Sequence, residues 1–194
     1  DVTQEELDWA SEVLEEYSDR NAMVMTHAHR KPSTNPDGRG AAFSHDGYRI
    51  DQSILRQHDN VFLVLSGHEH GVDIEVRKDV GMPENNIVEL LADYQFYEVS
   101  AEELGLTGID GRNPNDMLRF GSSFFRMLQI DVDASEMAVD TYSPLLENFG
   151  PPNMTTAPAT TAPTMTPDCP SSWKLAAPHF PPTRSCSLPQ LMRS

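Results

Sequence analysis

Four histidines in two His-x-His pairs are the residues of this chain whose type and spacing could support chemistry. His27 and His29 form the first pair, and His68 and His70 form the second within Gly67-His68-Glu69-His70-Gly71. Imidazole nitrogens bind zinc, iron, manganese and related divalent metals. Glycines on both sides of the second pair permit a tight backbone turn beside a bound ion. The two pairs therefore indicate a metal site.

Each pair directly follows a continuous apolar run, Ala22–Met25 in the first case and Val61–Leu65 in the second. A helix is expected ahead of each run, the first starting at the capping box of Thr3 and Glu6 and the second covering about 50–57. This pattern is typical of neighbouring parallel strands buried on both faces. Ligands of such sheets bind beyond the carboxyl ends of the strands, and residues two apart in an extended chain point the same way. We therefore expect the imidazoles to meet in one crevice.

The second half of the body has a different pattern. Strands are expected over 87–91 and 95–99, and a hairpin over 124–131 and 137–142 with its turn at Asp133-Ala134-Ser135. Between them, 100–121 is expected to be an irregular excursion with a short helix near 101–104. The predicted fold class is α/β tending to α+β, with a parallel part followed by an antiparallel part.

A change of composition near Gly150 marks the end of the body. Ten of the fifteen prolines lie beyond it, and Thr155–Thr166 consists almost entirely of Thr, Ala and Pro. Such a segment cannot bury enough apolar surface to fold. We predict one domain over 1–149 and a Pro/Thr/Ala-rich linker or disordered tail over 150–194. Both cysteines, Cys169 and Cys186, lie in this tail, so no disulfide or cysteine-based zinc site organises the body.

The charge balance excludes several classes of partner. The chain has 30 acidic and 14 basic residues and a net charge of −16. An acidic surface repels the phosphates of nucleic acids and anionic lipids, and no apolar stretch is long enough to span a membrane. An anionic small substrate is compatible only with a bound cation. An acidic body with a Thr/Pro-rich linker favours an extracellular or secreted location, with the cytoplasm as the alternative; the oligomeric state is left open.

The residues around the histidines resemble a known family. Val61 to Gly71 resembles the closing Gly-His-x-His motif of calcineurin-like metallophosphoesterases, and Met23-Val24-Met25-Thr26-His27 resembles the strand-plus-histidine motif that precedes it. Asp93-Tyr94-Gln95 and the hairpin over 122–142 are similar to the second sheet of that fold. The resemblance covers roughly residues 1–146. It implies the C-terminal half of a four-layer α/β/β/α sandwich with mixed sheets.

The resemblance also implies a function and a set of ligands. Members of the family hydrolyse phosphate esters at two divalent metal ions, which are Zn, Mn, Fe or similar. Carried over by motif, His27 and His68 would bind one ion and His70 the other. His29 would either hold these ligands in position without binding an ion itself, or contact a small phosphorylated substrate.

The family's earlier motifs do not occur in this chain. These motifs are Asp-x-His, Gly-Asp-x-x-Asp and Gly-Asn-His-(Asp/Glu), which supply the bridging carboxylate and the histidine that assists the leaving group. No catalytic residue is therefore expected within the segment, and both of these groups are expected upstream of Asp1. We expect the parent protein to be a hydrolase and this segment to be inactive alone.

Two other interpretations remain open. The chain could be a non-catalytic binding or scaffold domain with vestigial metal histidines. It could also be another histidine-rich hydrolase, but Arg30-Lys31 stand where a metallo-β-lactamase motif has Asp-His, and an eight-fold βα barrel does not fit in this length.

Overall fold

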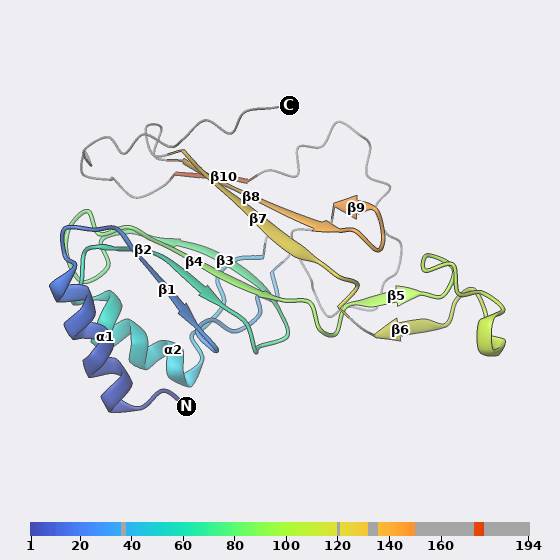
Figure 1. Ribbon diagram of the computed structural model, residues 1–194, viewed down its shortest axis with the longest axis horizontal. Coiled ribbons are helices and arrows are strands. Elements are labelled where there is room, and N and C mark those ends of the chain that lie inside the picture. Colours follow the sequence, from blue (N-terminus) through green and yellow to red (C-terminus); the bar gives the residue numbers. More distant parts are fainter. Residues whose placement is uncertain (36–37, 120, 132–135, 150–172, 177–194) are drawn as a thin grey trace, which may run out of the picture.

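A computed structural model of the chain describes residues 1–35, 38–119, 121–131, 136–149 and 173–176, which form three layers (Figure 1). Helices α1 (Gln4–Glu16) and α2 (His45–Ile50) cover one face of a four-stranded first sheet. A second sheet lies over the other face. The first sheet has the order β1-β2-β4-β3, with bounds Ala22–Thr26, Val61–Ser66, Ile87–Asp93 and Gly71–Arg77. The described part is thus a mixed α/β structure with open sheets and more strand than helix.

The first helix forms as predicted. The Thr3 hydroxyl accepts a hydrogen bond from the Glu6 amide at 3.2 Å, and the Thr3 amide donates to the Glu6 carboxylate at 2.7 Å. This capping box satisfies amides that have no partner within the helix. Leu7 and Leu14, seven residues apart, are buried on the inner side of α1.

The second helix begins earlier than predicted. Ser44 caps α2 by accepting a hydrogen bond from the Gly47 amide at 2.9 Å, and the helix continues as the π-helical turn η1 (Asp51–Leu55). Gly47 allows α2 to lie directly on the chain that follows β1, because a Cβ atom there would be 1.9 Å from the carbonyl oxygen of His29. This close approach links the helix layer to the ends of the strands.

The two apolar runs form neighbouring parallel strands, as predicted. β1 pairs with β2, with Met25 opposite Leu65 and Thr26 opposite Ser66, and β2 pairs in parallel with β4. β3 was not predicted; it runs antiparallel to β4 at the edge of the sheet. Its side chains alternate between apolar residues on one face and Asp73, Glu75 and Arg77 on the other, so it lacks a continuous apolar run.

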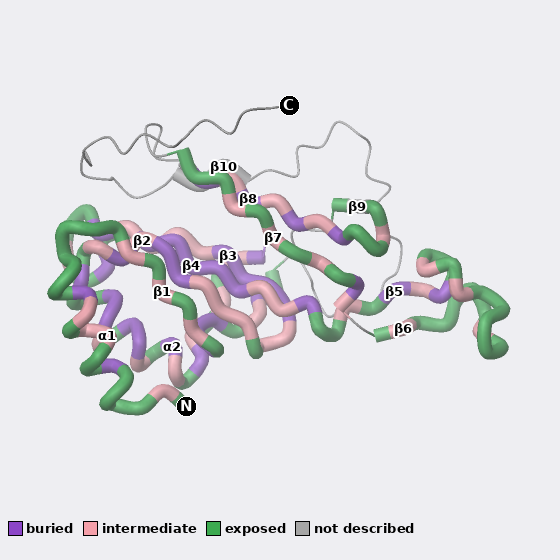
Figure 2. The backbone as a smooth tube through the Cα atoms, in the orientation of Figure 1, coloured by how far each residue is buried: buried purple, intermediate pink, exposed green. Residues whose placement is uncertain are grey.

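Two apolar clusters hold the layers together. One lies between the helices and the first sheet, and the other lies between the two sheets. The first comprises Leu7, Leu14, Ile50, Ile54, Leu55, Val61, Val64, Val80 and Ile87. The second comprises Leu63, Ile74, Val88, Leu90, Met137 and Val139. Figure 2 shows this burial concentrated in the central strands of the first sheet.

The predicted hairpin is present in the second sheet. β7 (Phe125–Asp131) pairs antiparallel with β8 (Glu136–Ser143), and the predicted turn residues 133–135 lie outside the described residues. β9 (Asn148–Phe149) also pairs with β8. Within the segment expected to be a linker or disordered tail, Trp173–Ala176 form β10 on the other side of β8. A strand already in place offers unpaired backbone groups, and even a short apolar segment can satisfy them.

A two-stranded arm projects from the body. β5 (Glu98–Ser100) pairs antiparallel with β6 (Met117–Arg119), and the arm is mostly exposed in Figure 2. The expected strand over 95–99 is wrong in its first part, because the Gln95 amide donates to Asp93 Oδ1 at 3.0 Å and the Tyr97 amide donates to the Tyr94 carbonyl at 2.9 Å, which turns the chain. The expected helix near 101–104 is a series of turns, and the arm's helical turn, η2 (Ile109–Gly111), lies further on.

No helix among the described residues combines the length and apolar character needed to cross a membrane.

Candidate metal centre

His27 and His68 lie side by side just beyond the ends of two parallel strands. β1 ends at Thr26 and β2 ends at Ser66, which are opposite each other in the register. The Gly67 amide donates to the His27 carbonyl at 3.2 Å and extends the pairing by one step. The two imidazole centroids are 4.4 Å apart, with 40° between the ring planes, and both residues are exposed. The structure brings these two residues together at the expected edge of the sheet, and metal binding by them stays a prediction.

The turn after β2 has its left-handed residue at an unexpected position. Gly67 was expected to supply the conformational freedom, but His68 has the positive φ, 65°. A non-glycine residue in this region costs roughly 1–2 kcal/mol. Such outliers concentrate at functional sites. Gly71 supplies the freedom on the other side, with φ of 142°, and a Cβ there would lie 2.5 Å from Pro32 Cβ.

His70 lies apart from that pair. Its ring packs against Phe96 with centroids 3.9 Å apart, and its Nδ1 lies 3.3 Å from Oδ2 of Asp93. The Nδ1 atom is buried and makes no hydrogen bond within the described part of the chain. His70 therefore belongs to the edge formed by β3, β4 and the turn after β4.

The three predicted ligands do not by themselves form a closed site. Within the described ranges, one set of three His, Asp or Glu residues has ligand atoms all within 4.8 Å of one another, and it consists of Asp1, His45 and Asp46 on the surface near α2. His27, His68 and His70 do not form such a set. An ion held by any of them would need further ligands from elsewhere, as the missing motifs also indicate.

His29 is separated from His27 by one residue but lies in the interior. It is fully buried, with Nε2 3.4 Å from Oε1 of Glu89, and its ring centroid lies 5.2 Å from that of Phe43. The expectation that both members of each pair point into one crevice is wrong here, because the chain leaves the extended conformation at the end of β1. In this position His29 does not reach a substrate in solvent, so direct substrate contact is not supported.

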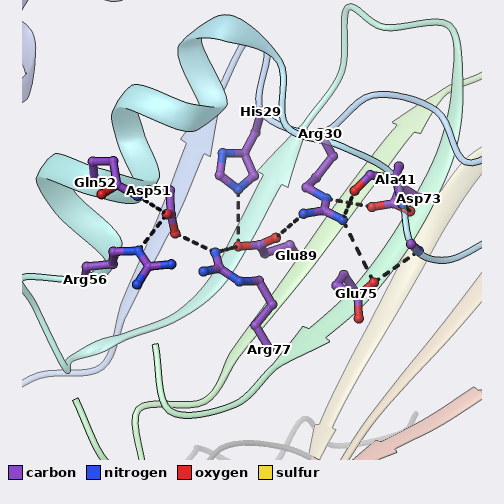
Figure 3. Close-up of polar contacts among 11 residues, drawn as sticks. His29, Arg30, Ala41, Asp51, Gln52, Arg56, Asp73, Glu75, Arg77 and Glu89 are labelled. Atoms are coloured by element: carbon purple, nitrogen blue, oxygen red, sulfur yellow. Dashed lines mark hydrogen bonds and ion pairs between the residues drawn. The ribbon is translucent and has the colours of Figure 1, made fainter. Parts of the chain in front are cut away.

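Sequence reasoning missed the buried charge cluster around His29 (Figure 3). Its side chains come from the loop after β1, from the α2–η1 segment, and from the helix-facing sides of β3 and β4. The members are His29, Arg30, Asp51, Arg56, Asp73, Glu75, Arg77 and Glu89. The sequence signal was the alternation of charged and apolar residues over 71–77 together with one glutamate inside the apolar run over 87–91.

Two arginines connect most of this cluster. Arg77 lies 2.6 Å from an Asp51 oxygen and 2.9 Å from a Glu89 oxygen. Arg30 lies 2.8 Å from Asp73 and 3.3 Å from Glu89. Both guanidinium groups also lie over the ring of Phe43. The distance from the guanidinium carbon to the ring centroid is 4.8 Å for Arg30 and 5.1 Å for Arg77. Buried charges are tolerated only when paired in this way.

The pKa values of the buried acids reflect the quality of this pairing. Burial alone would raise the pKa of Glu89, but His29 and Arg77 outweigh it and the pKa is lowered. The pKa of Asp51 is also lowered, because Arg56 and Arg77 outweigh the effect of burial. The pKa of Asp73 is raised, because burial outweighs the contribution of Arg30. The cluster therefore holds Asp51 and Glu89 as stable carboxylates.

Comparison with known proteins adds one distant relative. The chain is 28% identical over 152 residues to YvnB of Bacillus subtilis (strain 168), an uncharacterized protein, and the match covers 76% of this chain. The match covers 10% of that relative's length. No family model matches the chain.

Proposed function

We propose that this chain supplies the histidine ligands of a metal-dependent phosphoesterase, and that residues outside the chain complete the site. The observation that carries the proposal is the pair of exposed imidazoles, 4.4 Å apart, beyond the carboxyl ends of β1 and β2. Ligands of open α/β sheets bind at this position. The resemblance to calcineurin-like metallophosphoesterases supports the proposal, and it assigns His27 and His68 to one ion and His70 to the other.

The donor set fits divalent transition metals. Imidazole is a common ligand of Zn²⁺ and its neighbours, with bonds of about 2.0–2.1 Å to zinc. His27 and His68 are accessible to an ion from solvent, and the strand register holds their backbones at a fixed separation. Divalent ions at such a site supply a nucleophile from water at neutral pH and offset the charge of a phosphate ester. The acidic chain offers little positive charge of its own for a phosphorylated substrate.

We also propose that the described layers are part of a four-layer α/β/β/α sandwich. β1 lies at an edge of the first sheet, and Met25 on this strand is 77% exposed. A parallel strand with an exposed apolar side chain is unusual, because parallel sheets are normally covered on both faces. Further strands from another part of the parent protein, paired with β1, would cover this edge and bring the missing carboxylates toward His27.

The non-catalytic alternative is favoured by one observation. Within the described residues, no acidic side chain joins His27 and His68 in a set of three ligand atoms within 4.8 Å. A scaffold domain with vestigial histidines would have this arrangement and would bind no metal there.

Zinc titration of the 1–194 chain, followed by calorimetry, separates these functions. We expect binding that is lost in His68→Ala and retained in His45→Ala. The His45→Ala variant is the matched control because it removes an exposed histidine from the candidate set that the described residues form elsewhere, with Asp1 and Asp46. Binding that is lost in His45→Ala and kept in His68→Ala, or no binding at all, would contradict the proposal.

A second assay tests the division of the site between this chain and the rest of the parent. With added Mn²⁺ or Zn²⁺, the 1–194 chain should not hydrolyse p-nitrophenyl phosphate. Turnover that disappears in His68→Ala would show that the chain contains a complete catalytic site and that our assignment of the missing residues is wrong.

A further inference from the structure

The two nitrogens of His70 have different surroundings. Nδ1 is buried and lies 3.3 Å from Oδ2 of Asp93, whereas the residue as a whole is partly exposed. A neutral imidazole has one nitrogen that donates and one that accepts, and a carboxylate oxygen only accepts. The contact is therefore favourable only when Nδ1 carries the proton. In that tautomer the lone pair available to a ligand is on Nε2.

Asp93 is held in place by the backbone. It is the last residue of β4 and lies opposite Gly71 in the β3–β4 register, directly beside His70. Its Oδ1 accepts a hydrogen bond from the Gln95 amide at 3.0 Å, which leaves Oδ2 facing the imidazole. The carboxylate thus has one oxygen in a hydrogen bond to the turn and the other 3.3 Å from His70 Nδ1, close enough to favour a proton on that nitrogen.

The ring of His70 is also restrained from its side. Phe96 packs against it with centroids 3.9 Å apart, and the guanidinium carbon of Arg119 lies 5.5 Å from the Phe96 centroid. Phe96 comes from the same turn as Asp93. Residues of this one turn therefore limit the tilt of the imidazole, through Phe96, and place a carboxylate beside one of its two nitrogens, through Asp93.

We propose that Asp93 is a positioning residue that holds His70 in the Nδ1–H tautomer, so that Nε2 is free to bind a divalent metal ion. This inference rests on the proposed function, because it assumes that His70 is a ligand. Histidines that bind metals usually donate their second N–H to a carboxylate or carbonyl, and loss of that partner typically lowers metal affinity 10–100-fold. No local pattern links Asp93 to His70, because the two residues are 23 positions apart in the chain.

The tautomer can be measured without metal. Long-range ¹H–¹⁵N spectra of the metal-free chain at about pH 8, above the ordinary histidine pKa of about 6.5, report which nitrogen is protonated, and His70→Ala assigns the signals. We expect a protonated Nδ1 in the wild type. In Asp93→Asn the amide oxygen should stay on the Gln95 amide, so that the NH₂ group faces His70 and donates to Nδ1. The proton should then move to Nε2.

Zinc affinity supplies the second readout. Asp93→Asn should weaken about 10–100-fold the Zn²⁺ binding that is lost in His70→Ala, with an unchanged circular dichroism spectrum and thermal midpoint. Glu69→Gln is the matched control, because it removes one negative charge beside the same histidine without a contact to Nδ1. An equal loss of affinity in both variants would reduce the effect to charge and overturn the proposal.

The outcomes separate this inference from the proposed function. A wild-type His70 protonated on Nε2 overturns the role of Asp93, even if Zn²⁺ binds normally. A protonated Nδ1 in a wild-type chain that binds no Zn²⁺ overturns the proposed function and, with it, the role of His70 as a ligand.

Discussion

His27 and His29 are separated by a single residue, yet they occupy opposite environments. His27 is exposed and faces another exposed imidazole, whereas His29 is fully buried between Phe43 and Glu89. The chain passes from the end of β1 into the interior within these three residues. The comparison shows that a His-x-His pattern at a strand end does not fix the direction of both rings once the extended backbone has ended.

The two regions also differ in what holds them. The buried charge cluster consists of groups that pair with one another, so that removal of a shared member such as Arg77 takes an ion-pair partner from both Asp51 and Glu89. The exposed histidine pair makes few protein contacts that folding needs. We infer that the cluster serves the fold and that the pair is available for a ligand. The following predictions test this division, from the largest expected effect to the smallest.

Arg77→Met should be the most destabilising of these substitutions. It removes the nearest cation of one buried carboxylate, Glu89 at 2.9 Å, and one of the two arginines at another, Asp51 at 2.6 Å. Leaving buried charges without their partner costs roughly 3–5 kcal/mol, to be measured by urea unfolding. The matched control is Arg119→Met, whose ion pair with Glu98 is exposed and should contribute about 0–1 kcal/mol. Similar losses in both variants would contradict a structural role for the cluster.

His29→Ala should also destabilise the fold, by a smaller amount. The substitution removes a fully buried ring and leaves a cavity beside Glu89, with a cost of roughly 2–4 kcal/mol in the free energy of unfolding. Zinc binding by the protein that remains folded should be unchanged, because the ring lies in the interior. Loss of zinc binding without loss of stability would place His29 among the ligands instead.

Asp51→Asn and Asp73→Asn should respond to pH in opposite directions. The lowered pKa of Asp51 means that its contribution to stability is complete above the ordinary aspartate pKa of about 3.9 and is lost as the pH falls through the folded-state value. Its removal should cost roughly 1–3 kcal/mol at neutral pH, and this deficit should shrink on acidification. The raised pKa of Asp73 has the opposite effect on stability, because the native state binds the proton more tightly than the unfolded state does.

The deficit of Asp73→Asn relative to wild type should therefore grow as the pH falls through the folded-state pKa toward the unfolded value. Unfolding of both variants and the wild type at several values between about pH 3 and 7 covers the relevant range of aspartate titration. Parallel curves for the two variants would show that the pairing does not set these pKa values.

The parts of the fold that follow from local pattern were predictable from the sequence. The capping box at Thr3 placed α1, and the continuous apolar runs placed β1 and β2 as parallel neighbours. β3 was missed because a strand with charged residues on its helix-facing side resembles a polar loop until their partners are known, which are Arg30 for Asp73 and Glu75 and Asp51 for Arg77. Those contacts join residues far apart in the chain, which no local pattern reveals.

The candidate site was predictable to the same extent. The strand ends placed His27 beside His68, but neither the burial of His29 nor the contact of His70 with Asp93 followed from spacing. The burial of His29 depends on how the chain bends after β1 and on Gly47, which lets α2 lie against that bend. The contact of His70 with Asp93 depends on a turn after β4 that was interpreted as a strand.

His27→Ala should have the smallest effect on stability and a large effect on metal binding. The side chain is exposed and its main contact is with the ring of His68, so the free energy of unfolding should stay within about 0.5 kcal/mol of wild type. Zinc affinity should fall by more than the roughly 10–100-fold that follows loss of a ligand's hydrogen-bond partner, because a ligand itself is removed. Compared with His29→Ala, two positions away, the variant should show the reverse combination of effects. If His27→Ala were as destabilising as His29→Ala, the exposed pair would belong to the fold, and its separation from the buried charge cluster would not hold.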